Sequence, residues 1–182
     1  MEAKEGNIRV VVFVGRRRHN MVRKTVNGTA QDVSARRAVA ADATTIAACV
    51  DAAYSPYVGR IGKRPAPVLT DYVRAIAEYQ VWIVEGKNSD CKGVLVLIPK
   101  PTYLLLDNVA VHPKHQGRGI GCRLIALAEA EAIRQGFREL RLYTNEKMVE
   151  NIAMYKHLGW EEVGRGVEDG YKRVFMRKTP KR

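Results

Sequence analysis

The chain has 182 residues, of which 46% are hydrophobic, so it can form one domain with a substantial core. Its 31 Lys and Arg residues outnumber 19 Asp and Glu residues, giving a net charge of +12. This excess suits nucleic acid, a phosphorylated cofactor or a solvated basic surface equally well. Cys49, Cys91 and Cys122 are far apart and lack CxxC spacing, which argues against a disulfide framework or a zinc site.

The first 34 residues differ from the remainder of the chain. A β-prone run at 8–14 is followed by a basic cluster at 16–18 and a polar segment without helical or strand periodicity. The run is too short to span a membrane, and the basic cluster follows it, the reverse of a secretory signal. We therefore expect a cytoplasmic protein with a flexible extension over 1–34 and one domain over 35–182. An extra strand in the extension and a natural start at Met21 stay open as alternatives.

From residue 35 onward, hydrophobic periodicity predicts a regular series of elements. The expected strands cover 36–39, 81–84, 93–98, 102–111, 140–144, 161–165 and 171–177. Helices are expected over 42–54, after Thr70 as N-cap, after the glycine-rich turn at 116–121, and after Asn145 as N-cap. Three prolines and two glycines predict a loop or broken helical segment over 55–68. The order β-α-α-β-β-β-α-β-α-β-β favours a mixed α+β sheet over a doubly wound parallel one.

The turn Gln-Gly-Arg-Gly-Ile-Gly at 116–121 lies between an expected strand and a long amphipathic helix. Such a turn is suited to an anion, because the first N–H groups of a helix have no partner inside the helix. A Walker loop would need Gly-Lys-Ser/Thr, which the chain lacks. A dinucleotide fingerprint would stand in the first βα turn, whereas two expected helices precede this turn. Neither nucleotide pattern therefore explains it.

Three segments together resemble the GCN5-related N-acetyltransferase (GNAT) superfamily, over roughly residues 35 to 178. They are Leu-Leu-Asp-Asn-Val-Ala-Val-His-Pro at 105–113, the glycine turn at 116–121, and Asn-Ile-Ala-Met-Tyr-Lys-His-Leu-Gly-Trp at 151–160. The resemblance implies a mixed, mostly antiparallel central sheet flanked by helices in three α/β/α layers. It also implies acetyl-CoA as the acetyl donor and no metal.

The resemblance implies a set of residues that contact acetyl-CoA through the glycine turn and the preceding strand. In such enzymes the turn's backbone binds the pyrophosphate, and the pantetheine arm pairs with the strand like an added strand. The amide of Val109 would polarise the thioester carbonyl. The expected cofactor-binding residues are Val109, Ala110, Val111, Gln116, Gly117, Arg118, Gly119, Ile120, Gly121 and Asn151.

The resemblance also implies that Tyr155 acts as the general acid that protonates the departing thiolate. The base is less well defined, because several relatives carry a Glu where this chain has Tyr143. Asp107 is the first candidate, and Glu85 or a chain of waters are the others. Asp107 is equally compatible with an exposed carboxylate at the end of a strand.

In this family the segment before the second helix shapes the acceptor site. Tyr54, Tyr57, Arg60 and Lys63 fall there and would bind an acceptor that bears a carboxylate or phosphate, or else belong to an ordinary loop. The expected function is transfer of an acetyl group to a primary amine by direct attack in a ternary complex. The acceptor would be a small molecule or a peptide, with no membrane or nucleic-acid partner and a possible homodimer. A non-catalytic acyl-CoA-binding regulatory module on the same fold is the alternative.

Overall fold

The computed structural model describes residues 35–86 and 90–181. The expected N-terminal extension and most of the turn between the strands at 81–84 and 93–98 lie outside these residues. The strands are β1 (Ala35–Arg37), β2 (Gln80–Glu85), β3 (Cys91–Pro99), β4 (Leu104–Val111), β5 (Leu140–Asn145), β6 (Glu161–Glu168) and β7 (Tyr171–Lys178). The α-helices are α1 (Ala43–Ile61), α2 (Tyr72–Glu78), α3 (Ile120–Arg134) and α4 (Val149–His157). The element order predicted from the sequence is therefore confirmed.

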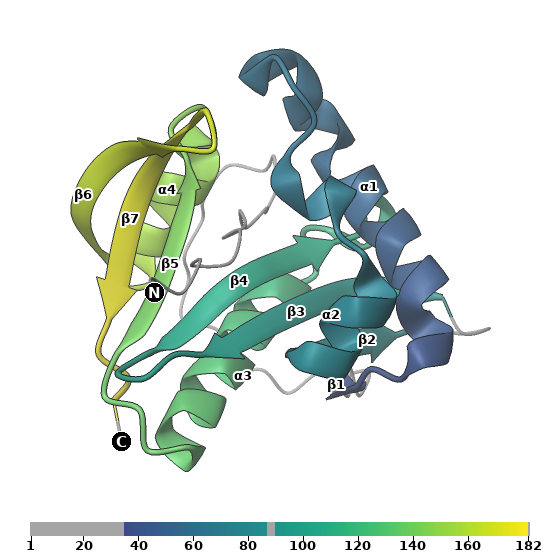
Figure 1. Ribbon diagram of the computed structural model, residues 1–182, viewed down its shortest axis with the longest axis horizontal. Coiled ribbons are helices and arrows are strands. Elements are labelled where there is room, and N and C mark those ends of the chain that lie inside the picture. The colour runs from purple at the N-terminus through teal and green to yellow at the C-terminus, as the bar shows by residue number, and fades with distance from the viewer. Residues whose placement is uncertain (1–34, 87–89, 182) are drawn as a thin grey trace, which may run out of the picture.

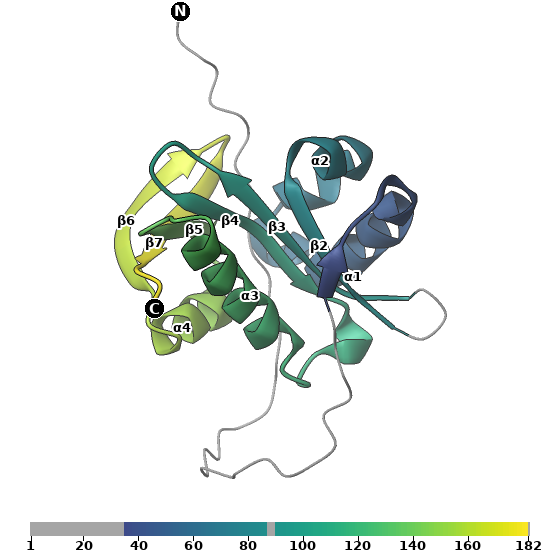
Figure 2. The same ribbon diagram turned by 90° about the horizontal axis from the view of Figure 1, so that it is seen from below.

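The strands form one sheet in the order β1-β2-β3-β4-β5-β7-β6. Every neighbouring pair is antiparallel except β4 and β5, which are parallel. Helices α1 and α2 cover one face of the sheet, and α3 and α4 cover the other (Figures 1 and 2). Each face has its own hydrophobic cluster of buried side chains. The mixed α+β fold with three layers is thus as expected.

Helix α1 is longer than the sequence suggested. It continues through Pro56 to Ile61 and ends at Gly62, which has a left-handed φ of 83°. Of the two alternatives for 55–68, a loop is therefore wrong over the first seven residues, whereas a broken helical segment agrees with α1 to Ile61 and a short 3-10 helix at Ala66–Leu69. The buried side of the helix continues past the proline: Tyr57, the next residue, is only 2% exposed. This packing offsets the backbone hydrogen bond that Pro56 removes from the helix.

Two of the expected helix starts are also displaced. Asp71, the residue after Thr70, caps α2 by accepting a hydrogen bond from the amide of Arg74 at 3.1 Å. Asn145 instead accepts from the amide of Lys147 at 2.9 Å, closing a local turn that ends β5 before α4 begins. Short polar side chains make either kind of bond, so the spacing alone did not separate a cap from a turn.

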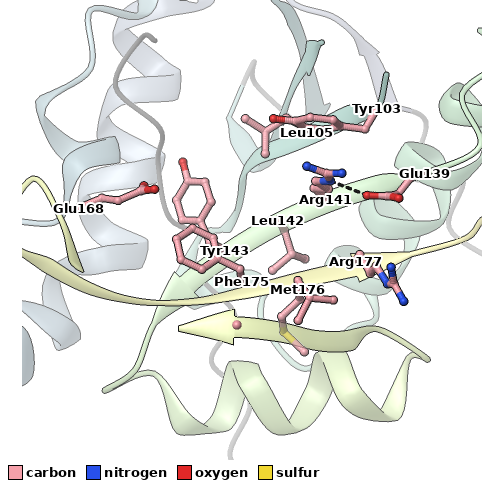
Figure 3. A pocket seen from close by; sticks show the side chains of 12 residues that line it. Tyr103, Leu105, Glu139, Arg141, Leu142, Tyr143, Glu168, Phe175, Met176 and Arg177 are labelled. Carbon is pink, nitrogen blue, oxygen red and sulfur yellow. Dashed lines mark hydrogen bonds and ion pairs between the residues drawn. The ribbon is translucent and has the colours of Figure 1, made fainter. Parts of the chain in front are cut away.

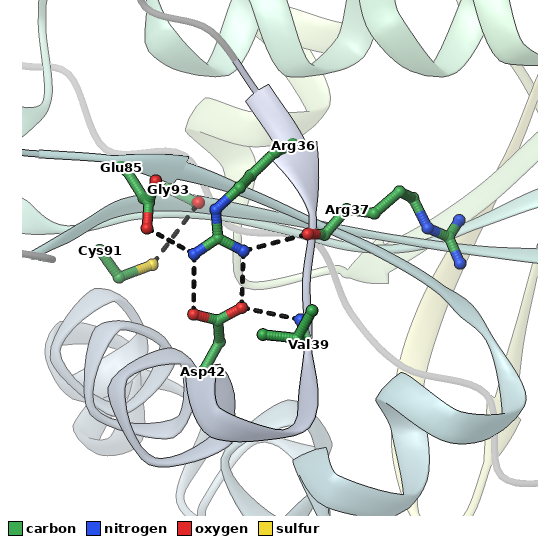
Figure 4. Close-up of polar contacts among 7 residues, drawn as sticks. All are labelled: Arg36, Arg37, Val39, Asp42, Glu85, Cys91 and Gly93. Carbon is green, nitrogen blue, oxygen red and sulfur yellow. Dashed lines mark hydrogen bonds and ion pairs between the residues drawn. The ribbon is translucent and has the colours of Figure 1, made fainter.

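An arginine connects the edge of the sheet to the start of α1. The guanidinium of Arg36 donates to both carboxylate oxygens of Asp42, at 2.8 and 2.9 Å, and also to Glu85 (Figure 4). Asp42 accepts a further bond from the amide of Val39 at 2.7 Å. Hydrogen bonding to Arg36 holds the pKa of Asp42 below its usual range. Glu85, a lesser candidate for the base, therefore pairs with Arg36 on β1 and β2, away from β4.

Candidate active site

Strands β4 and β5 separate soon after they meet. Their only pairs in the described structure are Leu104 with Leu140 and Leu105 with Arg141. Beyond these pairs the two strands diverge (Figure 1). The edge of β4 that faces β5 therefore has no strand partner from Leu106 onward among the described residues. A free strand edge presents N–H and C=O groups to which an extended ligand can bind.

A β-bulge lies in β4 at the point where the strands separate. Leu97 pairs with Leu106 and Val96 pairs with Asn108, so Asp107 is the extra residue. Asp107 is only 2% exposed, and the alternative of an exposed strand-end carboxylate is wrong. Bulges re-aim side chains and are frequent beside active sites. The structure thus places a buried carboxylate at the opening between the strands.

Asn108, next to Asp107, is the centre of a buried polar network that the sequence reasoning missed. The hydroxyl of Tyr54 donates to its Oδ1 at 2.9 Å, and its Nδ2 donates to the hydroxyl of Tyr72 at 3.2 Å. Tyr72 in turn donates to the carbonyl of Pro67 at 3.0 Å. The network joins α1, the α2 region and β4 across the core. Two adjacent polar residues within an apolar strand were the available signal.

The glycine turn adopts a conformation that leaves its backbone open. Gly117 and Gly119 have left-handed φ values of 73° and 77°, and a Cβ added at either would meet no atom within 4 Å. Gly119 is the N-cap of α3, without a side-chain hydrogen bond and without an acidic residue in the first turn. The first amides of α3 are therefore available to an anion. The predicted anion site has the backbone geometry that it requires.

Tyr155 of α4 packs in the same hydrophobic cluster as Leu106 and Val109 of β4. It is fully buried, and its hydroxyl has no hydrogen-bond partner among the described residues. Burial raises the pKa of Tyr155 well above its ordinary value, with a further contribution from Tyr57. Asn151 is also fully buried, one helical turn earlier. A buried and unsatisfied phenol carries a free-energy cost, which a ligand that accepts its hydrogen bond would remove.

The residues expected to bind the acceptor lie along the C-terminal half of α1 and beyond its end. Tyr54 and Tyr57 are buried. Arg60 forms an ion pair with Glu150 of α4 at 2.8 Å. Lys63 donates to the carbonyl of Asp169 at 2.9 Å, in the turn between β6 and β7. The two cations therefore connect the end of α1 to α4 and to the turn between β6 and β7.

A cavity of about 480 Å³ lies on the α1 side of the sheet, over β5 and β7 (Figure 3). It has aromatic and aliphatic walls and two arginines and two glutamates around it. Of its residues, the sequence reasoning had considered only Tyr143, as the position of a missing glutamate. The lining residues are Tyr103, Leu105, Glu139, Arg141, Leu142, Tyr143, Val163, Gly164, Glu168, Phe175, Met176 and Arg177.

Two further properties bear on the kind of site. Within residues 35–86 and 90–181, no group of three or more His, Cys, Asp or Glu side chains could hold a metal ion. No helix in the part of the chain that the structure describes is long and apolar enough to cross a membrane.

The opened mixed sheet, the glycine turn and the following helix define an acetyltransferase fold. Residues 77–162 match the family model described as an acetyltransferase (GNAT) domain. All three segments that carry the GNAT resemblance lie within this match. No protein of curated function matches the sequence.

Solved structures show the same fold at low sequence identity. PaiA N-acetyltransferase from Thermoplasma acidophilum, in complex with coenzyme A, has a TM-score of 0.68 and 17% identity over 80% of this chain and 98% of its own. YncA from Salmonella typhimurium, with its cofactor acetyl-CoA, has a TM-score of 0.61 and 21% identity over 84% and 96%. Nourseothricin acetyltransferase has a TM-score of 0.53 and 22% identity over 57% of this chain and 66% of its own. This chain thus spans slightly less than two thirds of that protein.

Proposed function

We propose that this protein is an acetyl-CoA-dependent N-acetyltransferase that acetylates a primary amine by direct attack in a ternary complex. The observation that carries the proposal is the buried hydroxyl of Tyr155, without a hydrogen-bond partner among the described residues, in the hydrophobic cluster that also holds Val109 of β4. A non-catalytic acyl-CoA-binding module would have no use for an unsatisfied phenol in its core. We expect a cytoplasmic enzyme whose acceptor is a small molecule or a peptide, and a homodimer is compatible with it.

The chain's groups fit acetyl-CoA along the whole length of the proposed site. The amides of the turn at 116–121 would bind the pyrophosphate, because left-handed glycines and the start of α3 leave them open. The free edge of β4 at 109–111 would pair with the pantetheine amides, and Asn151 would bind further along the arm. The thioester supplies an activated acetyl carbon. PaiA and YncA were solved with coenzyme A and acetyl-CoA respectively, which supports the same assignment here.

In this proposal Tyr155 gives a proton to the leaving thiolate, and Asp107 takes a proton from the amine. The amine nitrogen forms a bond to the acetyl carbon while the carbon–sulfur bond breaks, and the thiolate takes a proton from Tyr155. The amide of Val109 would donate to the carbonyl oxygen as negative charge develops on it. The amine loses a proton to Asp107, directly or through water, because a protonated amine cannot attack. No covalent intermediate on the enzyme is needed.

Two measurements test this proposal. Isothermal titration should show acetyl-CoA binding with a micromolar or lower Kd, and free-thiol release should depend on an added amine. Absence of binding, with the turn at 116–121 intact, would sink the cofactor assignment. Binding without turnover on any amine class would instead favour the regulatory module, for which the tyrosine at position 143 in place of a strand glutamate is the supporting observation.

A further inference from the structure

Arg173 on β7 is a buried arginine in the half of the sheet that holds the cavity. Its side chain is 1% exposed, and its guanidinium carbon lies 4.4 Å from the ring centroid of Tyr143. Its Nη1 donates to a carboxylate oxygen of Glu168 at 2.8 Å. Burying a guanidinium is costly unless its N–H groups find acceptors, so its remaining donors decide what the residue does.

Two of the three guanidinium nitrogens of Arg173 make no hydrogen bond to the described residues. Neither Nε nor Nη2 has a hydrogen-bond partner among the described residues, and neither is accessible to water. The carboxylate of Asp169 lies 3.5 Å from Nη2, close enough for electrostatic attraction only. Nε–H and Nη2–H point in parallel from one edge of the guanidinium. This edge is the fork that binds both oxygens of one carboxylate or phosphate.

The open space lies beside the two neighbours of Arg173. Tyr143 and Glu168, which contact the guanidinium, both line the 480 Å³ cavity. On β6, the residue paired with Arg173 is Gly166, and the next pair on the same face of the sheet is Gly164 with Phe175. A Cβ built at Gly164 would meet no atom within 4 Å. A side chain is thus missing from β6 where the cavity lies, and the space suits a ligand.

We propose that the Nε and Nη2 fork of Arg173 binds a carboxylate of the acceptor, so that the substrates are amines that also bear a carboxylate, such as amino acids. This inference rests on the proposed acetyltransferase function and specifies its acceptor. The charges favour a carboxylate over a phosphate. Arg173 and Lys63 offset Glu168 and Asp169 in the cluster, so a single negative charge is better tolerated than two.

The experiment compares matched acceptor pairs. Steady-state kcat/KM is measured for amino acids, for the amines made by removing their carboxyl groups, and for aminophosphonates of the same skeleton. The wild-type protein should prefer the amino acid over the decarboxylated amine by about 10-fold or more, because the amine leaves the buried fork unpaired. In Arg173→Lys, which keeps the charge and loses the fork, the preference should fall to about 2-fold or less.

Arg165→Gln is the matched control. Arg165 is an arginine of β6, more than half exposed, that pairs with Glu162 at 2.6 Å, so the variant should keep the wild-type preference. Thermal unfolding of each variant shows whether it is folded. Gly164→Leu is a second, independent variant: its Cβ meets no atom within 4 Å at the cavity wall, and the larger side chain should raise KM for amino acids several-fold with kcat little changed.

Several results would overturn the assignment. These are equal kcat/KM for amino acids and their amines in the wild type, a preference that survives in folded Arg173→Lys, or a preference for the aminophosphonate. If no amine is acetylated, the proposed function fails. The carboxylate site is then decided by calorimetric binding of an amino acid and its amine to wild type, Gly164→Leu and Arg173→Lys. Equal binding of the two ligands by the wild type would refute it.

Discussion

The side-chain amide of Gln116 donates a hydrogen bond to the backbone carbonyl of Val111, with 2.9 Å between Nε2 and the oxygen. The bond holds the first residue of the glycine turn against the last residue of β4. The turn and the free strand edge are the two parts of the proposed acetyl-CoA site. Gln116 was expected to contact the cofactor, and in the structure its side chain is used to set the position of the turn.

Gln116→Ala should therefore weaken acetyl-CoA binding without removing any chemical group of the reaction. We expect a several-fold increase in KM for acetyl-CoA with kcat little changed, and a loss of about 1 kcal/mol in the free energy of unfolding. Gln80→Ala is the matched control, because Gln80 exchanges amide hydrogen bonds with Gln135 at 2.9 Å on another part of the sheet. A similar KM increase in both variants would contradict the positioning role.

Tyr155→Phe tests the general acid. Loss of the hydroxyl should lower kcat by about 10²-fold or more, while the Kd for acetyl-CoA stays nearly constant. Because burial raises the pKa of Tyr155 well above 10.0, the wild-type hydroxyl should stay protonated through neutral and mildly alkaline pH. A kcat profile from pH 7 to 10 should show no loss that depends on Tyr155. Unchanged turnover in the variant would remove the residue from its role.

Two glycine substitutions should have opposite effects on stability. Gly119→Ala places a Cβ on a residue with a φ of 77°, which costs roughly 1–2 kcal/mol and should also weaken acetyl-CoA binding. Gly59→Ala lies on the exposed side of α1, where no atom is within 4 Å of the new Cβ. It should stabilise the protein by about 0.5–1 kcal/mol and leave binding unchanged. Urea unfolding and calorimetry measure both quantities, and equal effects of the two changes would contradict the prediction.

Glu162 should make the protein sensitive to acid. Hydrogen bonds from Arg165 and then Lys156 hold the pKa of its carboxyl at about 2, below the ordinary 4.5. A depressed pKa in the folded state stabilises the protein above the unfolded-state pKa, and this contribution is lost as the pH falls from about 4.5 towards 2. Glu162→Gln should therefore lose stability at pH 7 and show a smaller further loss between pH 5 and 3. Urea midpoints at the two ends of this range, for wild type and variant, provide the check.

The order of the elements was predictable because each has a local signature. Alternating or continuous apolar runs indicate the strands, and glycines at 136 and 159, both with positive φ, follow the ends of α3 and α4. Local signals were wrong where packing overrides them. Pro56 indicated a loop or a break in the helix, whereas the buried side chain of Tyr57 keeps α1 helical to Ile61.

The sequence by itself determined the resemblance to the GNAT superfamily and the glycine turn, because a glycine turn between a strand and a helix has a conformation set largely by its own residues. Only the tertiary structure decided which groups surround the proposed acceptor site. The bulge that buries Asp107 depends on the register of β4 against β3, and Arg173 is enclosed by side chains from β5 and β6. Residues far apart in the chain create these environments, and burial then sets the free-energy cost of leaving a polar group without a hydrogen bond. For that reason the unpaired hydroxyl of Tyr155 and the unpaired fork of Arg173 could not be predicted from the sequence.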